Sequence, residues 1–286
     1  MRALSSRISA SLDCLMEKML TAWLWLPFTH IQKPSRSGVP IIASLTSYPP
    51  RIRYAWIAIE TLLRQSVRPL KIILVLNVVD FPNRKIPRKL LSQGRRGLSI
   101  VWVRENGRSY DKILPVITAY PEETIVTFDD DKFFPPNLLQ ALFSASLNFP
   151  DTIIGSRGWE MKKSPGRDEL HYGQGWKRAQ PGSHGKMLFT PGGNGCLYPA
   201  GSLHESVRNL TAALSYCPTA DDIWLWGAAV KNGTKFHCLG LPAHRPVARQ
   251  KPTPALSDIN STENDRQLQK AIDVFSIRAA VQKNVP

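Results

Sequence analysis

The chain has 286 residues and carries 37 Lys and Arg against 22 Asp and Glu, a formal net charge of +15. A hydrophobic fraction of 43% with 9% aromatic residues excludes a disordered composition and suffices for one large domain or two small ones. This excess of positive charge favours anionic partners such as nucleic acid, anionic lipid or phosphorylated substrates. The four cysteines are Cys14, Cys196, Cys217 and Cys238. They lack the close spacing of a zinc site and are too few for a disulfide scaffold, so we expect a reducing compartment.

Residues 1–36 are predicted to form a separate N-terminal amphipathic segment close to a membrane. The apolar stretch 14–28 is interrupted by Glu17 and Lys18, and its uninterrupted part is shorter than the roughly 20 residues that span a bilayer. Arg2 and Arg7 precede it as in a signal peptide, but no small-residue cleavage site follows. We expect either a helix at the membrane interface or a helix packed on the domain.

The segment 33–40 reads as a linker, and the predicted domain extends over 37–250. Short β-branched or apolar runs predict strands at 41–45, 71–76, 98–103 and 124–128, and helical spacing predicts helices at 52–65, 111–120 and 136–147. Strands that are apolar throughout indicate a mainly parallel sheet with helices on both faces. Ligands of such α/β sheets bind beyond the carboxyl ends of the strands.

The second half of the chain is less regular. Residues 155–190 are rich in Gly, Lys, Arg, Trp and His with little periodicity, which is typical of a functional or mobile region. A glycine-rich stretch follows at 191–195, then a predicted helix at 219–233 and a last strand at 234–239. We expect residues 251–286 to form a C-terminal tail with one helix over 263–282.

Three consecutive carboxylates follow the predicted strand 124–128. Side chains alternate along an extended segment, so Asp129 and Asp131 should point one way and Asp130 the other. Two carboxylates on one side of a strand end suit a divalent cation, which completes its shell with waters and substrate phosphates. A solvated acidic turn is the plainer alternative.

Further motifs offer candidates for binding and catalysis. Asp221 and Asp222 open the helix 219–233, where they could favour the helix dipole behind a Thr219 cap or include a general base. Glycines at 192, 193 and 195 let the backbone approach a ligand closely or form an ordinary tight turn. After the first strand, Tyr48 could stack on a base and Arg51 could meet phosphate.

Lys112 begins a predicted helix after another strand, either as a plain surface lysine or as a diphosphate contact.

Taken in this order, the motifs resemble the GT-A fold of nucleotide-sugar glycosyltransferases, and most closely the family-2-like enzymes of bacterial cell-surface polysaccharide synthesis. The resemblance covers about residues 40–241 and is most specific in TIVTFDDD, PGGNGCLYP and TADDIWLWGAAVKNG. It implies a Rossmann-like α/β domain with a mainly parallel sheet flanked by helices, extended by N-terminal and C-terminal helical segments.

The resemblance also implies roles for individual residues. Asp129 and Asp131 would hold Mn²⁺ or Mg²⁺ on the donor diphosphate, with Asp130 near the ribose. Asp222 would be the base of an inverting displacement, aided by Asp221. The residues implied to contact the donor are Thr46, Tyr48, Arg51 and Asn77 around the nucleoside, Lys112 at the diphosphate, and Gly192, Gly193 and Asn194 under the sugar or acceptor.

The sequence departs from the family pattern at two points. Typical family members carry a D-D or D-x-S pair after the second strand, where this chain has Asn77 and a later Asp80. Many members add a metal-binding histidine after the last helix, for which His237 and His244 are both candidates.

The expected function is metal-dependent transfer of a sugar from a nucleotide-sugar donor to a saccharide or lipid-linked acceptor, with no nucleic acid as a partner. The basic segment 83–97 would face anionic lipid, which predicts a cytoplasmic protein and leaves open peripheral contact with the inner face of the plasma membrane. A nucleotidyltransferase that releases pyrophosphate is the alternative enzyme. A basic nucleic-acid-binding protein is supported by charge alone.

Overall fold

The computed structural model describes residues 39–163, 169–247 and 256–284. The expected N-terminal segment 1–36 and the domain boundary at 250 lie outside these residues. Nothing in the structure tests the proposed division of the chain.

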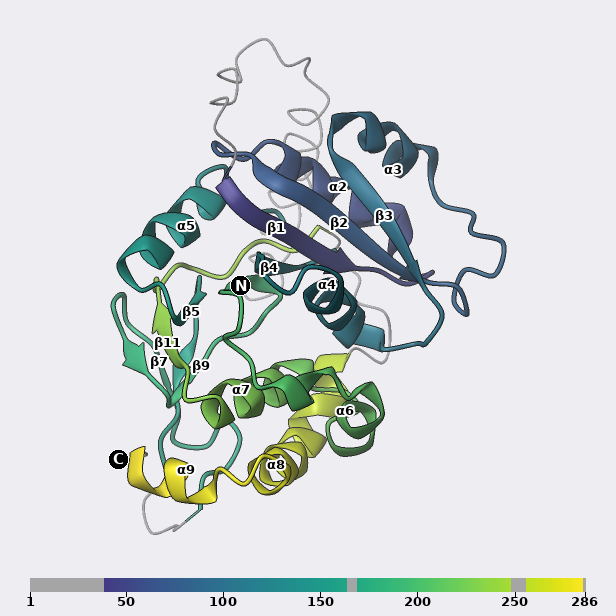
Figure 1. The fold of residues 1–286 in the computed structure, drawn as a ribbon. Helices are drawn as coiled ribbons and strands as arrows, with labels where there is room; N and C mark the ends of the chain where they lie inside the picture. Colours follow the sequence, from purple (N-terminus) through teal and green to yellow (C-terminus); the bar gives the residue numbers. More distant parts are fainter. Residues whose placement is uncertain (1–38, 164–168, 248–255, 285–286) are drawn as a thin grey trace, which may run out of the picture.

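An eight-stranded sheet forms the centre of the molecule (Figure 1). Its strand order is β3-β2-β1-β4-β10-β5-β11-β8. The strands are β1 (Val39–Thr46), β2 (Pro69–Asn77), β3 (Leu98–Val103), β4 (Thr124–Asp129), β5 (Thr152–Gly155), β8 (His184–Gly185), β10 (Asn194–Tyr198) and β11 (Lys235–Cys238).

The mainly parallel α/β sheet predicted from the apolar runs is confirmed, with two antiparallel strands added, β10 inside the sheet and β8 at its edge beside β11. Strands β1 to β4 pair in parallel, and so do β5 and β11. Between these two groups, β10 pairs antiparallel with both β4 and β5. The glycine-rich stretch that precedes β10 is therefore brought beside the end of β4.

Successive side chains of β1 point to opposite faces of the sheet, and helices cover both faces. Ile41, Ala43 and Leu45 pack into one buried cluster with side chains of α2 (Ile52–Leu63) and α5 (Leu138–Asn148). Ile42 points to the opposite face and packs with Val116 of α4 (Leu114–Ala119). Figure 1 shows α2 and α4 on opposite sides of these strands.

Several smaller helical elements complete the domain. They are α3 (Arg88–Gln93), η1 (Gly94–Arg96), η2 (Arg108–Lys112) and η3 (Glu205–Arg208). The single helix predicted over 111–120 is instead η2 followed by α4. Pro115 lies in the first turn of α4, and because proline lacks an N–H it is tolerated there but would break a continuous helix.

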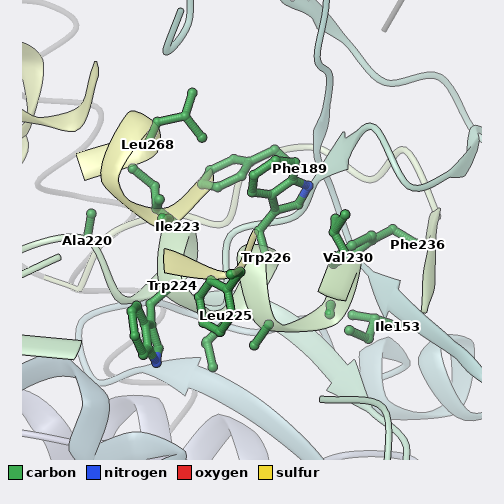
Figure 2. Packing of buried hydrophobic residues seen from close by; sticks show 14 of the residues in the cluster. Ile153, Phe189, Ala220, Ile223, Trp224, Leu225, Trp226, Val230, Phe236 and Leu268 are labelled. Atoms are coloured by element: carbon green, nitrogen blue, oxygen red, sulfur yellow. The ribbon is translucent and has the colours of Figure 1, made fainter. Parts of the chain in front are cut away.

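Helix α7 (Asp221–Lys231) is embedded in the second large core (Figure 2). Trp224 and Trp226 are buried, and each indole N–H donates to a backbone carbonyl 3.1 Å away. Around α7 lie α6 (Leu210–Tyr216) and α8 (Leu256–Val274), whose Leu268 joins the same core. The rigid packing of α7 fixes the position of the two aspartates at its start.

The C-terminal part is not a loose tail. The helix predicted over 263–282 is interrupted, because α8 ends at Val274 and α9 (Arg278–Asn284) follows a short break. Ser276 in the break has a φ of 53°, outside the right-handed helical region. Phe275 packs on Trp224 with ring centroids 4.5 Å apart, so burial of this aromatic fixes the break.

A second sheet lies within the region that showed little periodicity. Its order is β7-β6-β9, with β6 (Trp159–Glu160), β7 (Lys177–Arg178) and β9 (Leu188–Phe189). Each strand has two residues, too short for an alternation pattern to be visible in the sequence.

Candidate active site

The glycine-rich stretch lies against the end of β4. The backbone N–H of Asp129 donates to the carbonyl of Gly193 at 3.1 Å, and the hydroxyl of Thr127 donates to the carbonyl of Gly192 at 3.0 Å. The N–H of Gly192 donates to Oδ1 of Asp222 at 2.9 Å. One turn therefore links the carboxylates that follow β4 with those that begin α7.

Both glycines are required by the closeness of this contact. A Cβ at Gly193 would lie 1.9 Å from Oδ2 of Asp129, and a Cβ at Gly192 would lie 2.8 Å from the Thr127 hydroxyl and 3.2 Å from Oδ1 of Asp222. Any larger residue would push the carboxylates away from the turn. The glycines thus serve to bring acidic groups together, a role that their sequence spacing alone did not specify.

We expect Gly193→Ala to lower the free energy of unfolding by about 1–3 kcal/mol through overpacking. Gly94→Ala is the matched control, because a Cβ at Gly94 would meet no atom within 4 Å and its φ of −54° is helical. Chemical denaturation of both variants measures the difference. Equal stability of the two would show that Asp129 does not need this glycine.

Lys112 lies between Asp129 and Asp221 and pairs with both. Its side chain is 5% exposed, and its Nζ lies 2.9 Å from Oδ2 of Asp221 and 3.5 Å from Oδ1 of Asp129. Burial alone would lower the pKa of Lys112, but Asp221 and Asp129 outweigh it and raise the pKa above its ordinary value. The lysine is therefore a permanently charged internal bridge and not the surface residue of the plainer interpretation.

A second cation, Lys132, pairs with Asp129 from the loop that follows β4. Nζ of Lys132 donates to Oδ2 of Asp129 at 2.8 Å and to the carbonyl of Gly193 at 3.3 Å. Burial tends to raise the pKa of Asp129, but attraction to Lys132 and Lys112 holds it well below the usual range. Asp129 is consequently a carboxylate throughout the physiological pH range.

The strand ends at Asp129, and the chain turns at Asp130 and Asp131. Arg51 pairs with both of the carboxylates that follow the strand, although the side chain of Asp130 is 3% exposed and that of Asp131 is 38% exposed. Nη2 of Arg51 contacts Oδ1 of Asp130 and lies 3.1 Å from Oδ1 of Asp131. The hydroxyl of Ser47 donates to Asp130, while burial raises the pKa of that carboxyl to about 6 against the opposing effects of Arg51 and Ser47.

Asp222 has the properties of a titrating group near neutral pH. Burial and the negative charge of Asp221 raise the pKa of Asp222 to about 7, against the opposing effects of Lys112 and the N–H of Gly192. The N-cap of α7 is Ala220 and not Thr219, whose hydroxyl accepts from Gln267 at 2.8 Å. Because neither aspartate is consumed as a cap, Oδ2 of Asp222 is left for other chemistry.

The residues predicted around the nucleoside divide into two groups. Tyr48 is exposed and lies beside Arg51, whose guanidinium carbon is 5.8 Å from the ring centroid. Thr46 instead donates its hydroxyl to the carbonyl of Val75 at 2.9 Å. Asn77 is buried, donates to the carbonyl of Glu105 at 2.5 Å and accepts from the N–H of Val79 at 2.7 Å. Thr46 and Asn77 therefore shape the loops after β1 and β2, because internal bonds occupy their side chains.

The two candidate histidines lie in different places. His237 is on β11, separated from β4 by β5 and β10, and stacks on Phe149 with centroids 4.3 Å apart. His244 contacts the site through its Nε2, 2.9 Å from the carbonyl of Asn194. Because β11 is distant from β4 in the sheet, the structure does not bring His237 into the acidic cluster.

Three residues that the sequence analysis did not single out belong to the site: Ser47, Thr127 and Lys132. Thr127 points toward the turn because it lies two residues before Asp129 on the same face of β4. Lys132 directly follows the triplet, and its proximity to Asp129 depends on the turn at Asp130. Only the adjacency in DDDK offered a signal for it.

The donor set suits a divalent cation bound by few protein ligands. Within the described residues no group of three or more His, Cys, Asp or Glu is arranged to hold a metal. Mg²⁺ is commonly bound by one or two carboxylates together with waters and substrate phosphates. Oδ1 of Asp131 is buried and lies 3.1 Å from Nη2 of Arg51, without a hydrogen bond from the described residues. When all groups are ionised, the five aspartates of the described cluster outnumber Arg51, Lys112 and Lys132 by two charges, which a divalent cation would balance.

No family model and no curated protein sequence matches this chain. Among solved structures, it is similar to residues 1–349 of S. aureus TarS in complex with UDP, with TM-score 0.50, 12% identity, and coverage of 83% of this chain and 65% of TarS 1–349. The complex of the same protein with UDP-GlcNAc gives TM-score 0.50 and 11% identity at the same coverage. A Pyrobaculum calidifontis mannosyltransferase in complex with GDP-Man and Mn²⁺ gives a TM-score of 0.31 at 14% identity, covering 52% of this chain and 43% of that chain.

The chain thus spans slightly less than two thirds of the length of TarS 1–349. At 11–12% identity the similarity concerns the fold. Its TM-score of 0.50 and the mainly parallel eight-stranded sheet show that this chain has the GT-A-type α/β fold.

Proposed function

We propose that this protein is a glycosyltransferase that moves a sugar from a nucleoside-diphosphate sugar to a hydroxyl group of a saccharide or lipid-linked acceptor. The strongest support is that one glycine turn brings together two carboxylates whose pKa values are shifted in opposite directions. Asp129 is held ionised, whereas Asp222 has a pKa of about 7. Two carboxylates with different pKa values are typical of a site with one electrostatic and one proton-accepting role.

The donor would lie at the Asp129 end of the site. Tyr48 and Arg51, after β1, provide an exposed aromatic ring and a guanidinium for the nucleoside and its phosphates. Asp129 and Asp131 would hold Mn²⁺ or Mg²⁺, which when bound stabilises the negative charge of the leaving diphosphate. Lys132, which is 20% exposed and contacts Asp129, would add positive charge on the same side.

The acceptor would lie at the Asp222 end. Oδ1 of Asp222 is occupied by the N–H of Gly192, so Oδ2 would take the proton from the acceptor hydroxyl. The acceptor oxygen forms a bond to the anomeric carbon as the bond from that carbon to the diphosphate oxygen breaks. A single displacement of this kind inverts the anomeric configuration, and Asp221, fixed by Lys112, keeps negative charge beside the base.

The occurrence of UDP and UDP-GlcNAc in complexes of a protein with the same fold supports a nucleotide-sugar donor. The role in bacterial cell-surface polysaccharide synthesis rests on the resemblance of the sequence motifs to family-2-like glycosyltransferases, and it is part of the proposal. None of the described helices combines the length and apolarity needed to cross a bilayer. Peripheral contact with an anionic membrane is part of the proposal, because residues 83–97 hold six Lys or Arg and no acid.

Calorimetric titration of UDP in the presence of Mn²⁺ tests the donor end. We expect Asp129→Ala to weaken UDP binding about 10- to 100-fold in Mn²⁺, the cost typical of disturbing a metal site, and to abolish the difference between Mn²⁺ and EDTA. Asp151→Ala is the control, since Asp151 is an exposed acid before β5. Unchanged metal-dependent binding in Asp129→Ala would remove the metal assignment.

A further inference from the structure

A second group of functional side chains lies beside the glycine turn, on the β5 side. β5 runs antiparallel to β10 and ends where β10 begins, and Arg157 follows β5 by two residues. The hydroxyl of Ser156 donates to the carbonyl of Asn194 at 2.7 Å, and the N–H of Ser156 donates to the carbonyl of Gly195 at 3.0 Å. Arg157 is therefore anchored next to the turn that carries Gly192 and Gly193.

Arg157 belongs to a patch formed with Trp159 and Arg178. The guanidinium carbon of Arg157 lies 4.9 Å from the ring centroid of Trp159. Trp159 on β6 is paired directly with Arg178 on β7, and directly opposed residues of antiparallel strands project from the same face. The side chain of Arg178 thus projects from the same face as the half-buried indole of Trp159, and its Nη2 donates to the carbonyl of Leu241 at 3.2 Å.

Among the described residues, no acid pairs with the arginines of this patch. The buried Nε of Arg157 has no hydrogen-bond acceptor in the same part of the chain. Glu160 follows Trp159 on the opposite face of β6, where it accepts from Ser183 at 2.8 Å. Burial and repulsion from Arg178 lower the pKa of Arg157.

We propose that Arg157, Trp159 and Arg178 form a subsite for an anionic sugar unit of the acceptor. The sugar ring would stack on the indole of Trp159, and a phosphate or carboxylate substituent would lie between the two guanidinium groups. Planar guanidinium groups bind such oxyanions with paired hydrogen bonds, and an aromatic face suits the apolar side of a sugar ring. The inference rests on the proposed glycosyl transfer, since it names the acceptor class for the same site.

The test measures probe binding to the full chain saturated with UDP and Mn²⁺, so that the donor site cannot take up the anion. The probes are glucose 6-phosphate, glucuronate and neutral glucose. We expect at least one anionic probe to bind about 10-fold more tightly than glucose, and Arg157→Gln to remove that advantage. Binding of the phosphate, the carboxylate or both identifies the substituent.

Two further variants separate the subsite from general charge and from misfolding. Arg178→Gln changes an exposed side chain and should also remove the advantage, whereas Lys177→Gln, on the opposite face of β7, should preserve it. UDP affinity should be equal in all variants. The subsite is overturned if wild-type protein binds the three probes with equal affinity. It is also overturned if Arg157→Gln and Arg178→Gln still bind the anionic probe more tightly than glucose by the full wild-type factor. In either case, UDP binding still supports the donor site. Absence of UDP binding by the wild-type chain overturns the proposed function itself, and the subsite with it.

Discussion

Replacing Asp222 with asparagine is expected to lower the rate of sugar transfer about 1,000-fold, within the range usual for loss of a general base. Asparagine can still accept the hydrogen bond from the N–H of Gly192, so the turn keeps its shape. It cannot take a proton from the acceptor hydroxyl. Steady-state rates with a nucleotide sugar and acceptor measure the loss, and unchanged UDP affinity provides the control.

The pH dependence of the same reaction gives a second readout. Asp222 must be ionised to act, and burial together with Asp221 raises its pKa to about 7. We therefore expect the wild-type rate to rise with pH through about 7 and then level off, and the residual rate of Asp222→Asn to lack this step. The raised pKa also means that ionised Asp222 destabilises the fold as pH rises from about 4 to 7. The asparagine variant should consequently be at least as stable as wild type at pH 8, and a large loss of stability there would contradict the assignment.

Replacing Lys112 with methionine is expected to lower the free energy of unfolding by about 3–5 kcal/mol at pH 7, the usual cost of breaking a buried ion pair. The change removes the cation that lies 2.9 Å from Asp221 and 3.5 Å from Asp129. Because the folded-state pKa of Lys112 lies above its ordinary value, the contribution of this lysine is present at all neutral pH values. Urea denaturation measures the loss.

Lys71→Met is the matched control, because Lys71 is half-buried and its Nζ contacts the phenol of Tyr120 at 3.0 Å instead of a carboxylate. It should cost less than about 1 kcal/mol. The deficit of Lys112→Met should shrink at low pH, since protonation of the neighbouring carboxylates removes their repulsion. Equal losses in the two variants would mean that Lys112 does not bridge the acidic groups.

The strands of the first half could be predicted because each contains a short apolar run, which in β1, β2 and β4 is buried on both faces. The expected runs at 71–76 and 98–103 lie within β2 and at β3, and the helix expected over 52–65 is α2. The contact of Asp129 with Lys112 was not predicted, because Lys112 lies in η2, nine residues after the end of β3.

The antiparallel insertion of β10 could not be predicted from local sequence. The stretch Asn194–Tyr198 is a strand because β4 and β5 lie on either side of it, and this is a long-range condition. The contact of Gly193 with Asp129 depends on the same insertion. The internal roles of Thr46 and Asn77 were missed for a related reason, since their partners Val75 and Glu105 belong to other segments.

The central claim is that the chain releases a nucleoside diphosphate from a nucleotide sugar as the sugar passes to an acceptor. The direct measurement incubates the protein with a panel of nucleotide sugars, Mn²⁺ and saccharide or lipid-linked acceptors, and quantifies nucleoside diphosphate, pyrophosphate and glycosylated product. We predict nucleoside diphosphate and glycosylated product in equal amounts for at least one pair, and formation of both about 1,000-fold more slowly with Asp222→Asn. Release of pyrophosphate would point to a nucleotidyltransferase, and absence of product with every donor and acceptor would contradict the account.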